Sequence, residues 1–263
     1  MSEFISFLAP PGHKIDNYNR SLPYSQQPDS VPSIFCDAMS VRETVFVKEQ
    51  QVPLENELDS DDPRCFHWVT YASVGAKASP VVTPQDKAGD KRKSSTASRV
   101  PVGVIRLVPP PHPPHAVPGT EHKIDNSEDA PRVPVLHDAH NAGPVSSHNP
   151  HNEPYIKLGR LAVLREYRKM RLGKLLVDTA LEWASKHAEE IVPPVSAMDV
   201  EAARVDGKEG EVSARWKGLV LVHAQKYVER TWRHYGFERD EGMGEWDEEG
   251  ITHVGMVSSC LGL

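Results

Sequence analysis

Several cations surround a single glycine just before an apolar stretch near the middle of the chain. The run from residue 165 to 176 reads REYRKMRLGKLL and contains Arg168, Lys169, Arg171, Gly173 and Lys174. The first amides of a helix have no intrahelical acceptor and attract anions, and a glycine lets a bulky ligand approach them. Basic side chains would otherwise oppose the helix dipole there. The pattern favours an anion-binding helix start, and a solvated basic loop is the alternative.

A nucleotide-binding P-loop does not explain this run. That motif needs a glycine, four residues and then Gly-Lys-Ser/Thr. The first glycine position is occupied here by Arg168, and Leu175 stands where the hydroxyl residue belongs.

The elements that position the run follow from its flanks. Strands are expected at 4–9, 66–73, 100–108, 155–164 and 217–225, and a turn plus a last strand within 245–259. Helices are expected within 34–50, from the basic run to about 191, and over 227–235 with Gly236 as C-cap. The central helix carries an apolar stripe made of Leu172, Leu176, Ala180 and Trp183, with Leu175 and Leu181 beside it. Strands alternating with helices predict an α/β fold with a mixed sheet.

Bulk properties limit the function classes. The chain has 263 residues and a formal charge of -7, which argues against a nucleic-acid surface. Cys36, Cys65 and Cys260 match no zinc or redox spacing, and an odd number suits a reducing compartment. No secretory signal and no apolar run of membrane-spanning length is visible. We therefore expect a cytoplasmic protein with no membrane partner.

Three polar stretches, at about 75–98, 109–154 and 193–216, interrupt what we interpret as a single domain over 1–263. The second is rich in proline and holds seven of the 13 histidines. Because no regular pair on a helix face and no cysteine accompanies them, we interpret it as a surface insertion and expect no metal.

The basic run resembles the acetyl-CoA pyrophosphate loop of the GNAT superfamily of N-acetyltransferases, whose motif is Q/R-x-x-G-x-G/A. Arg168 fills the first position and Gly173 the last, while Arg171 replaces the middle glycine. The loop is similar to that of some glucosamine-phosphate acetyltransferases, which carry a comparable replacement.

Two further segments are similar to the ElaA-like branch of this superfamily. The first, RETVFVKEQQVPLENELDSDD, is followed by His67, and the second is VHAQKYVERTWRHYGFERDEGMGEWDEEGITHVGM. Together with the loop they cover most of 34–73 and 155–257. Three motifs in the correct order make the resemblance specific.

The resemblance implies a GNAT fold, in which a mixed central sheet flanked by helices is splayed to bind acetyl-CoA as co-substrate. The backbone of Leu161, Ala162 and Val163 would meet the pantetheine arm and thioester, and Gln225 and Trp232 would flank the coenzyme. The pyrophosphate would lie on Arg168, Lys169, Met170, Arg171, Leu172, Gly173 and Lys174.

Catalytic roles are also implied. Deprotonation of the acceptor amine would need a base, for which the candidates are Glu49, Asp59, Asp62, Glu248 and His253. For Glu49 a solvated helix glutamate and for His253 a structural histidine remain alternatives. The family's usual tyrosine acid is replaced by Trp232, and Tyr235 is nearby. Acceptor binding is assigned to Arg42, Asp59, Asp62, Arg160 and Glu248, where the arginines could instead pair with the carboxylates.

We therefore expect transfer of acetyl from acetyl-CoA to a small primary amine, with an amino sugar such as glucosamine as the first hypothesis. A polyamine, an aralkylamine or a protein lysine or N-terminus remains open as acceptor, and a homodimer is possible. A non-catalytic acyl-CoA sensor is the alternative of a different class, and Trp232 is the residue that supports it.

Overall fold

A computed structural model describes residues 4–75, 97–110, 112–113, 115–122, 154–191 and 216–260. The strands are β1 (Ile5–Leu8), β2 (Phe66–Gly75), β3 (Ala97–Val108), β4 (Ile156–Val163), β5 (Leu219–Gln225), β6 (Glu238–Arg239), β7 (Glu245–Glu248) and β8 (Ile251–Ser259). The helices are α1 (Ser33–Arg42), α2 (Leu172–Lys186), α3 (Ala188–Ile191) and α5 (Glu229–His234). Shorter turns are η1 (Gly12–Ile15), η2 (Tyr24–Gln26), the π-helix η3 (Glu43–Glu49), η4 (Leu54–Asn56), η5 (Asp62–Arg64), η6 (Arg165–Tyr167), η7 (Lys226–Val228) and η8 (Glu241–Met243).

The eight strands form one mixed sheet in the order β1-β2-β3-β4-β5-β8-β6, with β7 also paired to β8. All neighbours are antiparallel except β4 and β5. Those two parallel strands pair only as far as Leu158 and Val222, although β4 runs on to Val163 and β5 to Gln225. The sheet is therefore open between the ends of its two central strands, as predicted.

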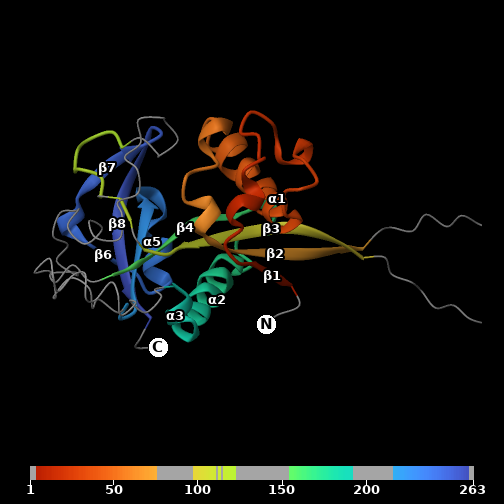
Figure 1. Ribbon diagram of the computed structural model, residues 1–263. Helices are drawn as coiled ribbons and strands as arrows, with labels where there is room; N and C mark the ends of the chain where they lie inside the picture. Colours follow the sequence, from red (N-terminus) through yellow and green to blue (C-terminus); the bar gives the residue numbers. More distant parts are fainter. Residues whose placement is uncertain are drawn as a thin grey trace, which may run out of the picture.

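Helices cover both faces of the sheet, and Figure 1 shows α1 and α2 on opposite sides of β1, β2 and β3. The main core lies on the α2 face, where Leu176, Val177 and Ala180 pack against strand residues such as Ile105 and Ile156. Of the two residues expected beside the apolar stripe, Leu175 is 39% exposed, whereas Leu181 is buried. Helix α2 also ends earlier than expected, at Lys186, and α3 continues after His187.

A bulge in β4 changes which side chains lie on the α1 face of the sheet. Val104 pairs with Ala162 and Arg106 with Gly159, so Arg160 and Leu161 both lie opposite Ile105. Arg160 adopts a positive φ of 49° to accommodate the extra residue. Because strand side chains alternate, the bulge turns Leu161 toward the α2 core. It leaves Arg160 on the α1 face, among the acidic side chains of that face.

Two predicted segments differ in detail from the structure. The expected helix within 34–50 is α1 followed by the π-helix η3, after which Gln51 has a φ of 65°. The expected turn and last strand are a hairpin of β7 and β8, since Glu249 and Gly250 both have positive φ, as a tight two-residue turn requires.

Part of the proline- and histidine-rich stretch is packed against the domain. Its described residues include 115–122, which run beside β7 in Figure 1 (yellow-green). Gly119 and His122 each donate a backbone hydrogen bond of 2.7 Å to this strand. His112 is buried, and its ring Nε2 donates to the Tyr155 carbonyl oxygen at 2.8 Å. The interpretation as a surface insertion is therefore wrong for His112; residues 123–153 lie outside the described residues.

Candidate active site

A cavity of about 630 Å³ occupies the opening between β4 and β5. The predicted site residues that line it are Glu49, Asp59, Arg160, Leu161, Ala162, Val163, Arg168, Gln225, Trp232, Glu248 and His253. Arg42 and Asp62 are fully buried behind its wall, so their placement argues against direct contact with an acceptor. Residues 169–174 and Tyr235 are likewise not among its lining residues in the described chain.

The β4 side of the cavity offers backbone groups. Leu161, Ala162 and Val163 lie beyond the last pair between β4 and β5 and still pair with β3 through Ala162 and Val163. A strand edge without a neighbouring strand presents N–H and C=O groups to whatever fills the opening. This segment can therefore bind an extended amide-containing chain.

The basic loop leads from β4 into α2 and has the backbone shape of an anion site. Lys169 and Arg171 have positive φ values of 67° and 62°, and Arg171 is the residue that precedes the helix. The first helical bond runs from the Leu175 N–H to the Arg171 carbonyl oxygen at 3.0 Å. The amides of the three preceding residues lie before that bond, at the positive end of the helix dipole. The loop can therefore hold a phosphate through its backbone.

The space at position 173 favours glycine. A Cβ atom placed on it would lie 2.7 Å from the Tyr235 hydroxyl oxygen. Tyr235 thus lies against the start of α2, and burial raises the pKa of its hydroxyl group. The structure places this predicted catalytic residue beside the anion loop, away from the cavity lining.

Glu49, the predicted base, is paired with the first residue of the loop. The Arg168 guanidinium donates to the Glu49 carboxylate at 2.7 Å and to the Val163 carbonyl oxygen at 2.9 Å. The next residue, Gln50, donates to Gln225 at 3.2 Å and to the Tyr227 hydroxyl at 2.9 Å. The end of η3 therefore joins the two sides of the opening.

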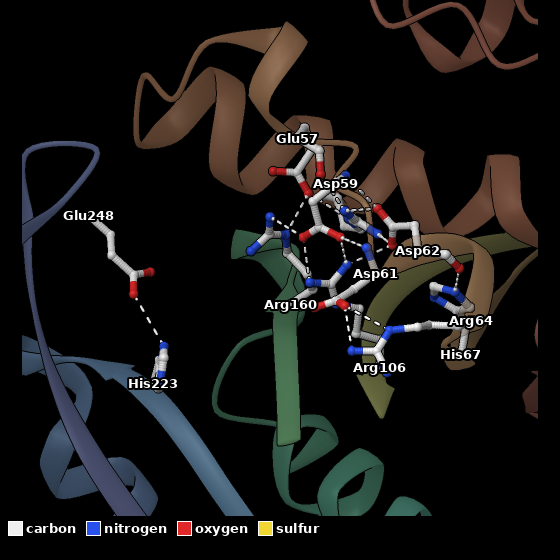
Figure 2. A network of polar contacts seen from close by, with 11 residues as sticks. Glu57, Asp59, Asp61, Asp62, Arg64, His67, Arg106, Arg160, His223 and Glu248 are labelled. Atoms are coloured by element: carbon white, nitrogen blue, oxygen red, sulfur yellow. Dashed lines mark hydrogen bonds and ion pairs between the residues drawn. The ribbon is translucent and has the colours of Figure 1, made fainter. Parts of the chain in front are cut away.

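A first polar cluster, which we call the ion-pair cluster, lies on the α1 face. It consists of Arg42, Arg106, Arg160, Glu57, Asp59 and Asp62 (Figure 2). Asp62 accepts from Arg42 at 2.7 Å and from Arg106 at 2.8 Å. Burial alone would raise the pKa of Asp62, but these guanidinium groups hold it well below its usual value. Asp59 binds Arg106 and, at 2.9 Å, Arg160, so the cluster reaches the cavity wall.

A second group, the histidine cluster, lies across the cavity and consists of His223, Glu248, His253 and Trp246. The Glu248 carboxylate accepts from the Trp246 indole N–H at 2.7 Å and lies 3.2 Å from His223 Nδ1. His253 Nε2 is 3.8 Å from the same carboxylate. Burial alone would raise the pKa of Glu248, but the His223 hydrogen bond and the two histidines hold it far below its usual value. The carboxylate therefore stays charged.

Sequence reasoning missed several cavity residues, of which Glu57, Arg106 and His223 belong to the two clusters. Arg106 and His223 stand inside strands, and only the strand register shows that they face the cavity side. His223 precedes the Ala-Gln pair that ends β5, and this position was the available signal. Among the described residues, no group of three or more His, Cys, Asp or Glu could hold a metal ion. In the same part of the chain, no helix is both long and apolar enough to cross a membrane.

Comparison with known proteins gives a partial match by sequence. Residues 97–195 match the model of the acetyltransferase (GNAT) family. No curated protein matches the chain significantly.

Solved structures that are similar in fold have low identity. One is a proposed N-acetyltransferase from Lactobacillus plantarum, at 15% identity and TM-score 0.48, covering 98% of this chain and 100% of that one. Another is ElaA of Escherichia coli, at 16% identity and TM-score 0.45, covering 97% of this chain and 99% of that one. A third is an acyl-CoA N-acyltransferase from Pseudomonas aeruginosa, at 15% identity and TM-score 0.43, covering 90% of this chain and 96% of that one.

The family match spans β3, β4 and α2, which are the elements that carry the sheet opening and the basic loop. Together with the mixed eight-stranded sheet, it identifies the fold of this chain as the GNAT fold, with the match to the family model at residues 97–195.

Proposed function

We propose that the protein transfers an acyl group, in the first instance acetyl, from acyl-CoA to a primary amine. The observation that carries this proposal is the opening between β4 and β5, which contains the cavity and leads along the β4 edge toward the basic loop at α2. A thioester whose carbonyl lies at this edge would meet backbone N–H groups that stabilise developing negative charge. The amides before Leu175, with Arg168 close by, suit the pyrophosphate.

The walls of the cavity support a short acyl group and a polar acceptor. Asp59, Arg160, His223 and Glu248 line the part beyond the last β4–β5 pair. A long apolar chain would have to displace these polar groups from their partners, which is unfavourable. Acetyl is therefore the donor group that we propose.

The acceptor is proposed as a small amine, with an amino sugar as the first candidate to test. Carboxylates on both walls favour an acceptor that carries positive charge, which also fits a polyamine. Aralkylamines and protein amines complete the panel.

A second candidate, a non-catalytic acyl-CoA sensor, is supported by one observation. Trp232 is buried at the cavity wall where the family's usual tyrosine acid would stand, and an indole cannot supply that proton. Thiol release from acetyl-CoA, measured over the amine panel, separates the two functions. Coenzyme binding without turnover on any amine would favour the sensor.

The Gly173→Asp variant tests the coenzyme site. The new side chain would collide with Tyr235 and place a carboxylate on the helix amides, in competition with the pyrophosphate. We expect CoA affinity to fall at least about tenfold in calorimetry, as the loss of a charge-assisted contact implies. Ser185→Asp, which adds the same charge near the other end of α2, is the control. Equal affinity in the two variants would refute the loop assignment.

A further inference from the structure

His223 stands at the point where the two central strands part. It follows Val222, the last residue of β5 that pairs with β4, and it lines the cavity. Its neighbours Val222 and Ala224 belong to the α2 core, so the alternation of the strand turns His223 to the cavity face. This is the place where a thioester held along the β4 edge and an amine from the other side would meet.

The partners of the ring define its tautomer. His223 Nδ1 lies 3.2 Å from Glu248, a carboxylate that cannot donate, so Nδ1 carries the proton. The other nitrogen, Nε2, then presents a lone pair. It is buried and has no hydrogen-bond partner among the residues that the structure describes. Figure 2 shows the two side chains facing each other, apart from the ion-pair cluster.

Several buried histidines of the described chain have a ring nitrogen without a hydrogen-bond partner, but His223 differs from the others in its location. Four histidines in the described residues have one: His67, His112, His115 and His223. Of these four, only His223 lines the cavity in that part of the chain. His223 is therefore the one whose unpartnered nitrogen belongs to a side chain of the cavity wall.

The other candidate bases are engaged elsewhere. His253 Nδ1 lies 2.8 Å from the Ile251 carbonyl oxygen and its Nε2 faces Glu248, so both of its nitrogens point at acceptors. Glu49 is paired with Arg168. Burial, and then the Lys157 ammonium, lower the pKa of His223 to about 4, so its ring is neutral at pH 7 and its protonated form is a ready acid.

We propose that His223 is the catalytic residue that takes the proton from the attacking amine and returns it to the departing thiolate. The amine nitrogen attacks the thioester carbonyl carbon, a C–N bond forms, and the proton on nitrogen passes to Nε2. The C–S bond then breaks, and Nε2 gives this proton to the sulfur, which leaves as free thiol. Glu248 stabilises the transient imidazolium through Nδ1.

This inference rests on the proposed acyl transfer, and it explains how the leaving thiolate can be protonated without the tyrosine that Trp232 replaces. One group that acts first as base and then as acid needs no separate tyrosine, so Trp232 at the wall is compatible with turnover. The reaction is balanced without any further proton donor, since the products are an amide and a thiol.

The test compares His223→Gln and His223→Ala with His234→Gln, which changes an exposed histidine on α5. We expect kcat on the best amine to fall by about 100- to 10,000-fold in both His223 variants, with CoA affinity within about twofold of the parent. Added imidazole should restore part of the rate in His223→Ala. His234→Gln should match the parent. Thermal unfolding of each variant verifies that it is folded.

The outcomes separate this inference from the function beneath it. If the parent protein binds no acyl-CoA, the proposed function fails. If the parent turns over and a folded His223→Gln variant keeps its kcat, His223 is not the proton-transfer residue and only this inference fails. A rate loss that imidazole does not relieve in His223→Ala would assign His223 a structural role instead.

Discussion

The two polar clusters that flank the cavity differ in how their charges are paired. In the ion-pair cluster each charged side chain has an oppositely charged partner, and Arg42 and Asp62 are fully buried. In the histidine cluster a single carboxylate has the Trp246 indole and two imidazole rings around it, and one ring nitrogen is left without a partner in the described chain. The first cluster fixes η4, η5, β3 and β4 to one another, whereas the second can accept a proton.

The difference indicates how to separate structure from chemistry in a polar cavity. Paired charges hold their protonation states over a wide pH range, because each one stabilises the other. A group that must gain and lose a proton during turnover cannot be held so firmly. The ion-pair cluster should therefore respond to substitution in stability, and the histidine cluster in rate.

The largest expected effect in stability is that of Asp62→Asn. The change leaves Arg42 and Arg106 with excess buried positive charge, and we expect the free energy of unfolding to fall by about 3–5 kcal/mol. Asp61→Asn, which breaks the more exposed pair with Arg64, is the matched control and should cost about 1 kcal/mol or less. Urea unfolding measures both. Similar losses in the two variants would remove the distinction between the clusters.

A smaller effect should appear on acidification. Burial lowers the pKa of His223 to about 4 from 6.5, so the unfolded chain binds this proton before the folded one does. The stability that the neutral ring contributes is complete above pH 6.5 and is lost as pH falls toward 4, at about 1.4 kcal/mol per pH unit. His67, which lies beside the ion-pair cluster, behaves in the same way, since burial lowers its pKa to about 4.

His223→Gln should therefore reduce the pH dependence of urea unfolding by about one proton between pH 6.5 and 4. Changing the exposed His13 to Gln should leave it as it is. A parent protein whose stability is flat over this interval would contradict the burial of neutral histidines. The Asp59 and Asp62 carboxylates titrate separately, because the neighbouring guanidinium groups lower the pKa of both.

The smallest effect concerns the end of η3. Glu49 competes with an incoming pyrophosphate for Arg168, and the pair is partly exposed, so its energy is modest. Glu49→Gln should tighten CoA binding by about two- to fivefold and leave the affinity for pantetheine, which lacks the pyrophosphate, unchanged. Glu166→Gln removes an exposed carboxylate from the same loop and is the control. Calorimetry that shows weaker CoA binding by Glu49→Gln would contradict this competition.

Local patterns predicted the elements better than the site. The strand over 155–164 and the Gly236 cap could be predicted because apolar periodicity and a glycine with positive φ, here 93°, are properties of neighbouring residues. The short strand β6, in contrast, has only two residues and depends on β8 for its existence.

Site residues depend on contacts between distant segments, which spacing does not encode. The bulge that leaves Arg160 on the α1 face appears only in the pairing of β3 with β4. Glu49 and Arg168 are 119 positions apart in the sequence. The sequence could therefore place both residues near the site without showing that they form an ion pair with each other. Arg42 and Asp62 share a motif with cavity residues, but their burial is a property of the packed fold.

The packed part of the proline-rich stretch has a consequence for association. β7 pairs with β8 on one side, and its other side is covered by residues 119–122, through backbone bonds to Glu245 and Asp247. A strand with an uncovered side can recruit a strand from another molecule. The segment thus covers a strand edge that could otherwise pair with another molecule. If it is shortened, we expect the first effect to be concentration-dependent self-association, measured by light scattering.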